Sequence, residues 1–111
     1  MSDEVDSDNL NMLRDLLGDK FGELVETFVE DATQRMDAMQ VALAKNDLEA
    51  VRREVHGLKG SCRNIGANPL GDLCHTMETQ AYDGALDNGQ QQFAAMEQRL
   101  AAVIAVLVAV Q

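Results

Sequence analysis

The residues best suited to chemistry in this sequence surround His56, one of the two histidines in the chain. Four of the nine lysine and arginine residues, Arg52, Arg53, Lys59 and Arg63, fall on or beside the same helical face. A neutral imidazole is a nucleophile near pH 7 and can take a phosphoryl group on nitrogen. Basic side chains stabilise the negative charge of that group. The pattern therefore indicates phosphoryl transfer at His56, although a solvated helix face with an incidental histidine would have the same spacing.

Gly60 follows His56 by about one helical turn and leaves open space beside the imidazole for a partner's active site. Phosphoryl transfer depends mainly on positioning and charge stabilisation, so a small scaffold is sufficient if a partner supplies the remaining groups. The sequence has no Gly-rich phosphate loop of either common type, which argues against ATP binding or kinase activity by this chain.

Helices must position these residues, because apolar side chains recur at spacings of three and four, and no segment alternates with period two. The pattern predicts a short helix over residues 9–17 and four longer ones, over about residues 21–43, 48–65, 68–81 and 90–107. The connections between them are short, which favours antiparallel neighbours. We therefore expect one all-α domain over residues 1–111. Its architecture would be an antiparallel up-down four-helix bundle preceded by a short N-terminal helix, with residues 1–8 disordered.

The helix predicted over residues 48–65 carries His56 on its polar side. Its apolar stripe consists of Leu48, Val51, Val55, Leu58, Cys62 and Ile65. On a helical wheel His56 points roughly 140° away from the centre of that stripe, so we expect an exposed imidazole rather than a core histidine. We also expect Gly66 to end this helix, and Asn68 to cap the next one ahead of Pro69.

Composition narrows the functional classes. The formal net charge is −10, which disfavours nucleic-acid binding and association with an acidic membrane surface. The start of the chain is polar and acidic and lacks the features of a signal peptide. The apolar run over residues 100–110 is too short for a membrane span and is expected to be the end of a buried helix. These features favour a cytoplasmic protein.

The remaining candidate ligands and nucleophiles do not form a recognisable site. His75 has no lysine or glycine one turn later and is expected to be an ordinary surface histidine. Cys62 and Cys74 fall on or beside apolar stripes, where a free cysteine behaves as a small hydrophobic residue. Their spacing matches no common zinc pattern, and the Glu-x-x-His pairs of di-iron bundles are absent. We therefore expect no metal site.

The segment from His56 to Ser61, His-Gly-Leu-Lys-Gly-Ser, followed by Asn-Ile-Gly-Ala over residues 64–67, resembles the signature of histidine-containing phosphotransfer (HPt) domains. The resemblance implies that His56 accepts the phosphoryl group, that Lys59 contacts its oxygens and that Gly60 keeps the approach clear. It also implies that Glu78, in the next helix, hydrogen-bonds the other ring nitrogen, with Ser61 in support.

The same resemblance implies a relay that takes phosphate from a receiver-domain aspartate and gives it to another receiver. The partners would be response-regulator receiver domains, a hybrid sensor kinase, or both, and Mg²⁺ would be supplied by the receiver rather than bound by this chain. We interpret Arg52, Arg53 and Arg63 as docking or charge-stabilising residues, and we expect a free-standing, monomeric protein. Two alternatives stay open. One is a docking module that sequesters a regulator without carrying phosphate, and the other is a metal-binding or redox bundle.

Overall fold

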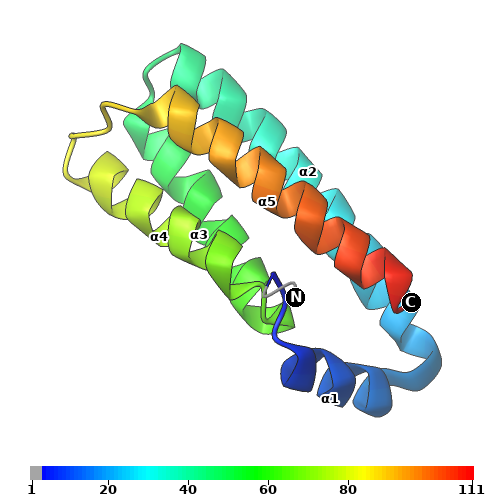
Figure 1. The fold of residues 1–111 in the computed structure, drawn as a ribbon. Coiled ribbons are helices and arrows are strands. Elements are labelled where there is room, and N and C mark those ends of the chain that lie inside the picture. The colour runs from blue at the N-terminus through cyan, green and yellow to red at the C-terminus, as the bar shows by residue number, and fades with distance from the viewer. Residues whose placement is uncertain (1–3) are drawn as a thin grey trace.

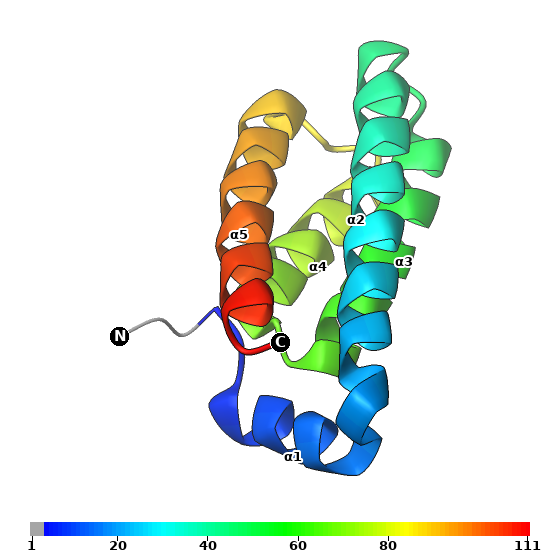
Figure 2. The ribbon, with the colours of Figure 1, turned by 90° about the vertical axis from the view of Figure 1, so that its right-hand side faces the viewer.

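Four long helices lie side by side and a short one crosses the end of the bundle in the computed structural model, which describes residues 4–111 (Figures 1 and 2). The elements in chain order are α1 (Ser7–Leu17), a 3₁₀ turn (Gly18–Lys20), α2 (Phe21–Ala44), α3 (Leu48–Ile65), α4 (Asn68–Tyr82) and α5 (Gly89–Ala109). The predicted all-α antiparallel four-helix bundle, preceded by a short N-terminal helix, is confirmed.

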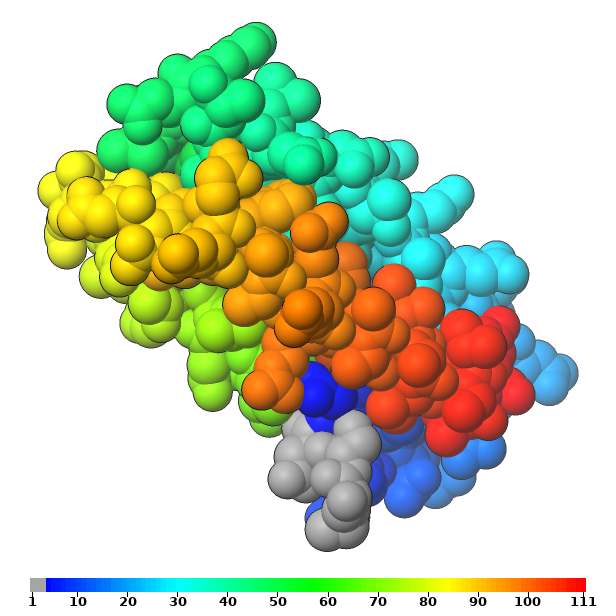
Figure 3. Space-filling model, turned by 45° about the horizontal axis from the view of Figure 1, so that its top comes forward, coloured from blue at the N-terminus to red at the C-terminus, as the bar shows by residue number. Residues whose placement is uncertain are grey.

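Helix α3 packs against α2 on one side and α4 on the other, while α5 packs against α4 and α2. On the face shown in Figure 3, α5 lies between α2 and α4. The core that joins these helices is apolar, and the large side chains that are fully buried in it include Met39, Val51, Val55, Leu58, Leu70, Met77, Met96 and Leu107. Because aromatic residues are few, methionine and leucine fill the space between the helices.

The ends of α3 are fixed by local interactions. The Asp47 side chain accepts a hydrogen bond from the backbone N–H of Ala50, at 3.1 Å, and caps the first turn. Gly66 ends the helix at φ 81°, in the left-handed region that favours glycine. The expected cap of α4 differs, because Ala67 occupies the N-cap position and the Asn68 side chain instead accepts a hydrogen bond from Arg63.

The prediction of disorder for residues 1–8 is wrong for the part that the structure describes; residues 1–3 lie outside that part. Val5 is buried in the core. The backbone N–H of Asp6 donates to the carbonyl of Gly66 at 2.9 Å, and the Asp6 side chain caps α1. Helix α1 therefore begins at Ser7, two residues earlier than the periodicity predicted. Tertiary contacts explain the difference from the prediction, because one buried valine and a hydrogen bond to the end of α3 hold this polar segment in place.

Helix α5 is the one described helix whose length and hydropathy would allow it to cross a membrane. The core helix of a soluble protein can meet the same test, so this result is weak evidence for a membrane span. The buried side chains of α5, from Phe93 to Leu107, recur at spacings of three and four, as expected for a helix that packs on one side.

Candidate phosphoryl-transfer site

Helix α3 presents His56 to solvent. Its neighbours Val55 and Leu58 are completely buried, which fixes the rotation of the helix, and the His56 side chain remains 67% exposed. The expectation of an exposed imidazole from the wheel therefore agrees with the structure. A ring in this position is accessible to a second protein.

Glu78 reaches from α4 to the His56 ring. Its Oε2 lies 2.6 Å from Nδ1 of His56. An ionised carboxylate can only accept hydrogen bonds, so we assign the ring proton to Nδ1. That tautomer leaves the lone pair of Nε2 free, and this nitrogen is the nucleophile of the ring.

Lys59 binds the other oxygen of the same carboxylate. Its Nζ lies 2.6 Å from Oε1 of Glu78, and both side chains are largely covered, at 23% and 17% exposure. Burial acts to raise the pKa of Glu78, but hydrogen bonds and charge interactions with Lys59 and His56 outweigh it and hold this pKa below its usual value. Glu78 is therefore ionised at neutral pH and can hold the tautomer of His56.

The second histidine joins this group. Nδ1 of His75 lies 3.4 Å from Nζ of Lys59, although we expected an ordinary surface histidine. The sequence did contain a signal, because residues 75 and 78 are three apart and share one face of α4. A shallow hollow of about 210 Å³ lies at this seam between α3 and α4, and its lining residues are Arg52, Lys59, His75, Glu78, Thr79 and Tyr82.

The three arginines near His56 in the sequence form ion pairs with carboxylates other than that of Glu78. Arg52 pairs weakly with Glu49, at 3.9 Å, and also lines the hollow. Arg53 lies 3.8 Å from Glu54. Arg63 is farther along α3, where it contacts Asp72 and Asn68 of α4.

Arg63 thus joins α3 to α4 at one end of the pair, and its guanidinium lies over Gly71. Arg52 is the arginine that the structure places beside Lys59, in the lining of the hollow. A role in partner docking stays a prediction for all three.

Gly57 and Gly60 differ sharply in their surroundings. A Cβ atom at Gly60 would meet nothing within 4 Å, whereas one at Gly57 would collide with the guanidinium of Arg35. Arg35 is held there by Asp31 and Glu54. Packing within the chain therefore explains the glycine at 57 and leaves the one at 60 unexplained.

Ser61 faces α2 rather than the imidazole. Its hydroxyl donates a hydrogen bond to Oδ2 of Asp31 at 3.0 Å, and this carboxylate also binds Arg35. Five residues along a helix amount to roughly 140° of rotation, which turns Ser61 away from His56. The supporting role for Ser61 beside His56 is therefore corrected, because its hydroxyl belongs to the α2–α3 contact.

Comparisons with known proteins agree with this geometry. Residues 23–106 match the family model of the Hpt domain. The chain belongs to the Hpt domain family. The solved structure of histidine-containing phosphotransfer protein B from Pseudomonas aeruginosa PAO1 superposes with a TM-score of 0.92 at 29% identity, over 96% of this chain and 93% of that one.

A curated relative, the sensor protein TorS of Escherichia coli (strain K12), is 31% identical over 83 residues, which are 74% of this chain and 9% of TorS. The chain therefore spans less than a tenth of the length of that relative. Membership in the family gives this chain a role in histidine phosphotransfer within a phosphorelay.

The two cysteines of this Hpt domain are buried and free. A hydrogen bond with Cys62, together with burial, raises the pKa of the Cys74 thiol. A protonated, buried thiol is neither a metal ligand nor a nucleophile. Among the described residues, no group of three or more histidine, cysteine, aspartate or glutamate side chains could hold a metal ion. The metal or redox alternative thus gains no support.

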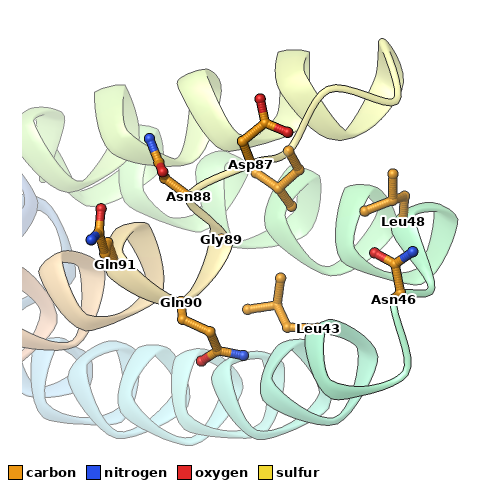
Figure 4. Close-up of a pocket in the computed structure, with 9 residues that line it drawn as sticks. Leu43, Asn46, Leu48, Asp87, Asn88, Gly89, Gln90 and Gln91 are labelled. Atoms are coloured by element: carbon orange, nitrogen blue, oxygen red, sulfur yellow. The ribbon is translucent and has the colours of Figure 1, made fainter.

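A larger hollow, of about 370 Å³, lies at the end of the bundle between the α2–α3 turn and the α4–α5 connection (Figure 4). Leu43, Leu48, Asp87 and several amide side chains line it, without a histidine, lysine or cysteine. Leu48 precedes His56 by more than two turns of α3. This hollow offers no nucleophile, so we place the site on the surface at His56.

Proposed function

We propose that this Hpt domain accepts a phosphoryl group on Nε2 of His56 from a receiver-domain aspartyl phosphate and passes it to a second receiver. The observation that carries the proposal is the 2.6 Å contact between His56 Nδ1 and Glu78 Oε2. It leaves the solvent-facing nitrogen unprotonated and ready to attack. The partners would be response-regulator receivers, a hybrid sensor kinase, or both.

The transfer requires no proton to move to or from the ring. The lone pair of Nε2 forms the N–P bond while the P–O bond to the receiver aspartate breaks, and the aspartate leaves as a carboxylate. The imidazole keeps its proton on Nδ1 and becomes positively charged. Glu78, which accepts that proton's hydrogen bond, stabilises the new charge. Lys59, which pairs with the other oxygen of the same carboxylate, would contact the phosphoryl oxygens.

Gly60 supports approach by a partner. Glycine inside a helix costs about 1 kcal/mol relative to alanine, and among residues 4–111 nothing lies within 4 Å of the position where a Cβ at Gly60 would stand. An approaching receiver surface would explain why a side chain is missing there. The receiver would also supply Mg²⁺ and the remaining catalytic groups, so this chain would need no cofactor of its own. We further propose that it acts as a cytoplasmic monomer, with the His56 face open to each partner in turn.

The test uses the fact that the chain has only two histidines. A phosphorylated receiver with Mg²⁺ is mixed with wild type, with His56→Asn, which retains only His75, and with His75→Asn, which retains only His56. We expect acid-labile label on wild type and on His75→Asn, and none on His56→Asn. Label on His56→Asn would overturn the assignment of the site.

The alternative is a docking module that binds a receiver without carrying phosphate. Receiver binding by wild type, measured by calorimetry, together with no label from any receiver in a panel, would favour that alternative. Sedimentation at several protein concentrations tests the monomer, and a dimer that buries His56 would contradict it.

A further inference from the structure

The ammonium group of Lys59 has two partners on α4. Glu78 Oε1 lies 2.6 Å from Nζ, and His75 Nδ1 lies 3.4 Å from it. An ammonium group has three hydrogens to donate and no lone pair to accept with. His75 Nδ1 is therefore the acceptor, which places the proton of that ring on Nε2.

This arrangement distinguishes the two histidines. His56 donates from Nδ1 to a carboxylate and keeps a free Nε2, whereas His75 accepts at Nδ1 from a cation and keeps its proton on Nε2. Nε2 of His75 carries the ring proton and is thus not a nucleophile. His75 instead contributes a hydrogen-bond acceptor, one turn before Glu78 on the same helix.

Two contacts constrain a lysine more than one does. The lysine side chain is long and flexible, and holding it in one geometry costs conformational entropy. The second contact removes part of that freedom before the phosphoryl group arrives. The ammonium group still has an N–H that can donate to a phosphoryl oxygen. Groups placed before the reaction need less reorganisation during it.

We propose that His75 is a positioning residue for phosphoryl transfer, which acts by holding the Lys59 ammonium beside Glu78 and His56. The proposal rests on the proposed function, because Lys59 must contact the phosphoryl group for its position to matter. His75 touches neither the phosphoryl group nor the His56 ring in this role.

The kinetic test compares His75→Ala with His75→Asn. Alanine removes the acceptor, and we expect the rate constant of transfer to fall about threefold to tenfold, which is the size of one hydrogen bond. The amide oxygen of asparagine can accept from Lys59 and should restore most of the rate. Thr76→Ala is the matched control, because Thr76 hydrogen-bonds its own helix backbone at Asp72, and its rate should equal that of wild type.

A double-mutant cycle separates positioning from a general effect on α4. If His75 acts through Lys59, His75→Ala should have no further effect on the rate in a Lys59→Ala background. An equal loss in both backgrounds would overturn the proposal, as would a wild-type or higher rate in His75→Ala. Receiver binding, measured separately, should be the same for wild type and His75→Ala.

A spectroscopic measurement tests the contact without any phosphate. Long-range ¹H–¹⁵N spectra should show His75 in the Nε2–H tautomer in wild type and a mixture of tautomers in Lys59→Ala. A mixture already in wild type would overturn the proposal. Failure of phosphotransfer in wild type, with this signature present, would instead count against the proposed function and leave the His75–Lys59 contact established.

Discussion

Lys59 and His56 share one carboxylate, since Glu78 binds the lysine through Oε1 and the imidazole through Oε2, each at 2.6 Å. The nucleophile and the cation that would meet the phosphoryl group are thus held by a single residue of the neighbouring helix. Removing that residue should affect both the tautomer of the ring and the position of the charge.

Replacement of Glu78 should slow transfer while leaving His56 exposed. For Glu78→Gln we expect about a tenfold loss of rate, because an uncharged acceptor stabilises the phosphorylated, positively charged ring less well. Glu78→Ala should lose more, because it also removes the acceptor that selects the Nδ1–H tautomer. Quench-flow transfer kinetics measure both rates, and a Glu78→Ala rate equal to wild type would contradict the assigned role.

The contact between Glu78 and its two partners should depend on pH in a defined direction. The pKa of this carboxyl is lower in the folded chain than in the unfolded chain. Its contribution to stability is therefore complete above the ordinary glutamate pKa and is lost as the pH falls through the lowered value. A ¹³C titration of the Glu78 carboxyl should give a midpoint below the usual glutamate range. A midpoint above that range would show that burial dominates.

The two glycines of the motif should respond differently to alanine. Gly60→Ala should raise the free energy of unfolding by about 0.5–1 kcal/mol through helix propensity, since nothing lies near the new methyl group. The same variant should transfer phosphate more slowly, because the methyl group would meet the incoming receiver. Gly57→Ala should gain less stability, because Arg35 must move away from Asp31 and Glu54.

Urea unfolding and transfer kinetics on both variants test this contrast. A Gly60→Ala protein that is more stable and transfers at the wild-type rate would contradict the proposal that the space at Gly60 is needed for a receiver to approach. Gly57→Ala is the contrasting variant, in which the displacement of Arg35 opposes the stabilising effect of alanine in the helix.

Ser61→Ala should affect stability rather than transfer. The lost hydrogen bond to Asp31 should lower the free energy of unfolding by about 0.5–1.5 kcal/mol. The partly covered Asp31 carboxylate would keep its contact with Arg35 but would lose the Ser61 hydroxyl as a donor. The rate of transfer should equal that of wild type. A slower rate of transfer at unchanged stability would show that Ser61 contributes to the phosphoryl-transfer site.

Sequence alone determined the features that one helix encodes by itself. The spacing of Val51, Val55, Leu58 and Cys62 fixed which side of α3 is buried and therefore that His56 is exposed. The end of α3 at Gly66 followed from local capping chemistry. The resemblance to the Hpt signature added Glu78, which no pattern within α3 could have supplied.

The tertiary structure decided how neighbouring helices face one another. The contact of His75 with Lys59 depends on the rotation of α4 against α3, and the bond of Ser61 to Asp31 depends on the register of α2. Val5 is buried only because the end of α3 and the bundle core meet there. Periodicity reports the faces of each helix separately, whereas these contacts arise from the packing of several helices at once, and only the folded chain brings them together.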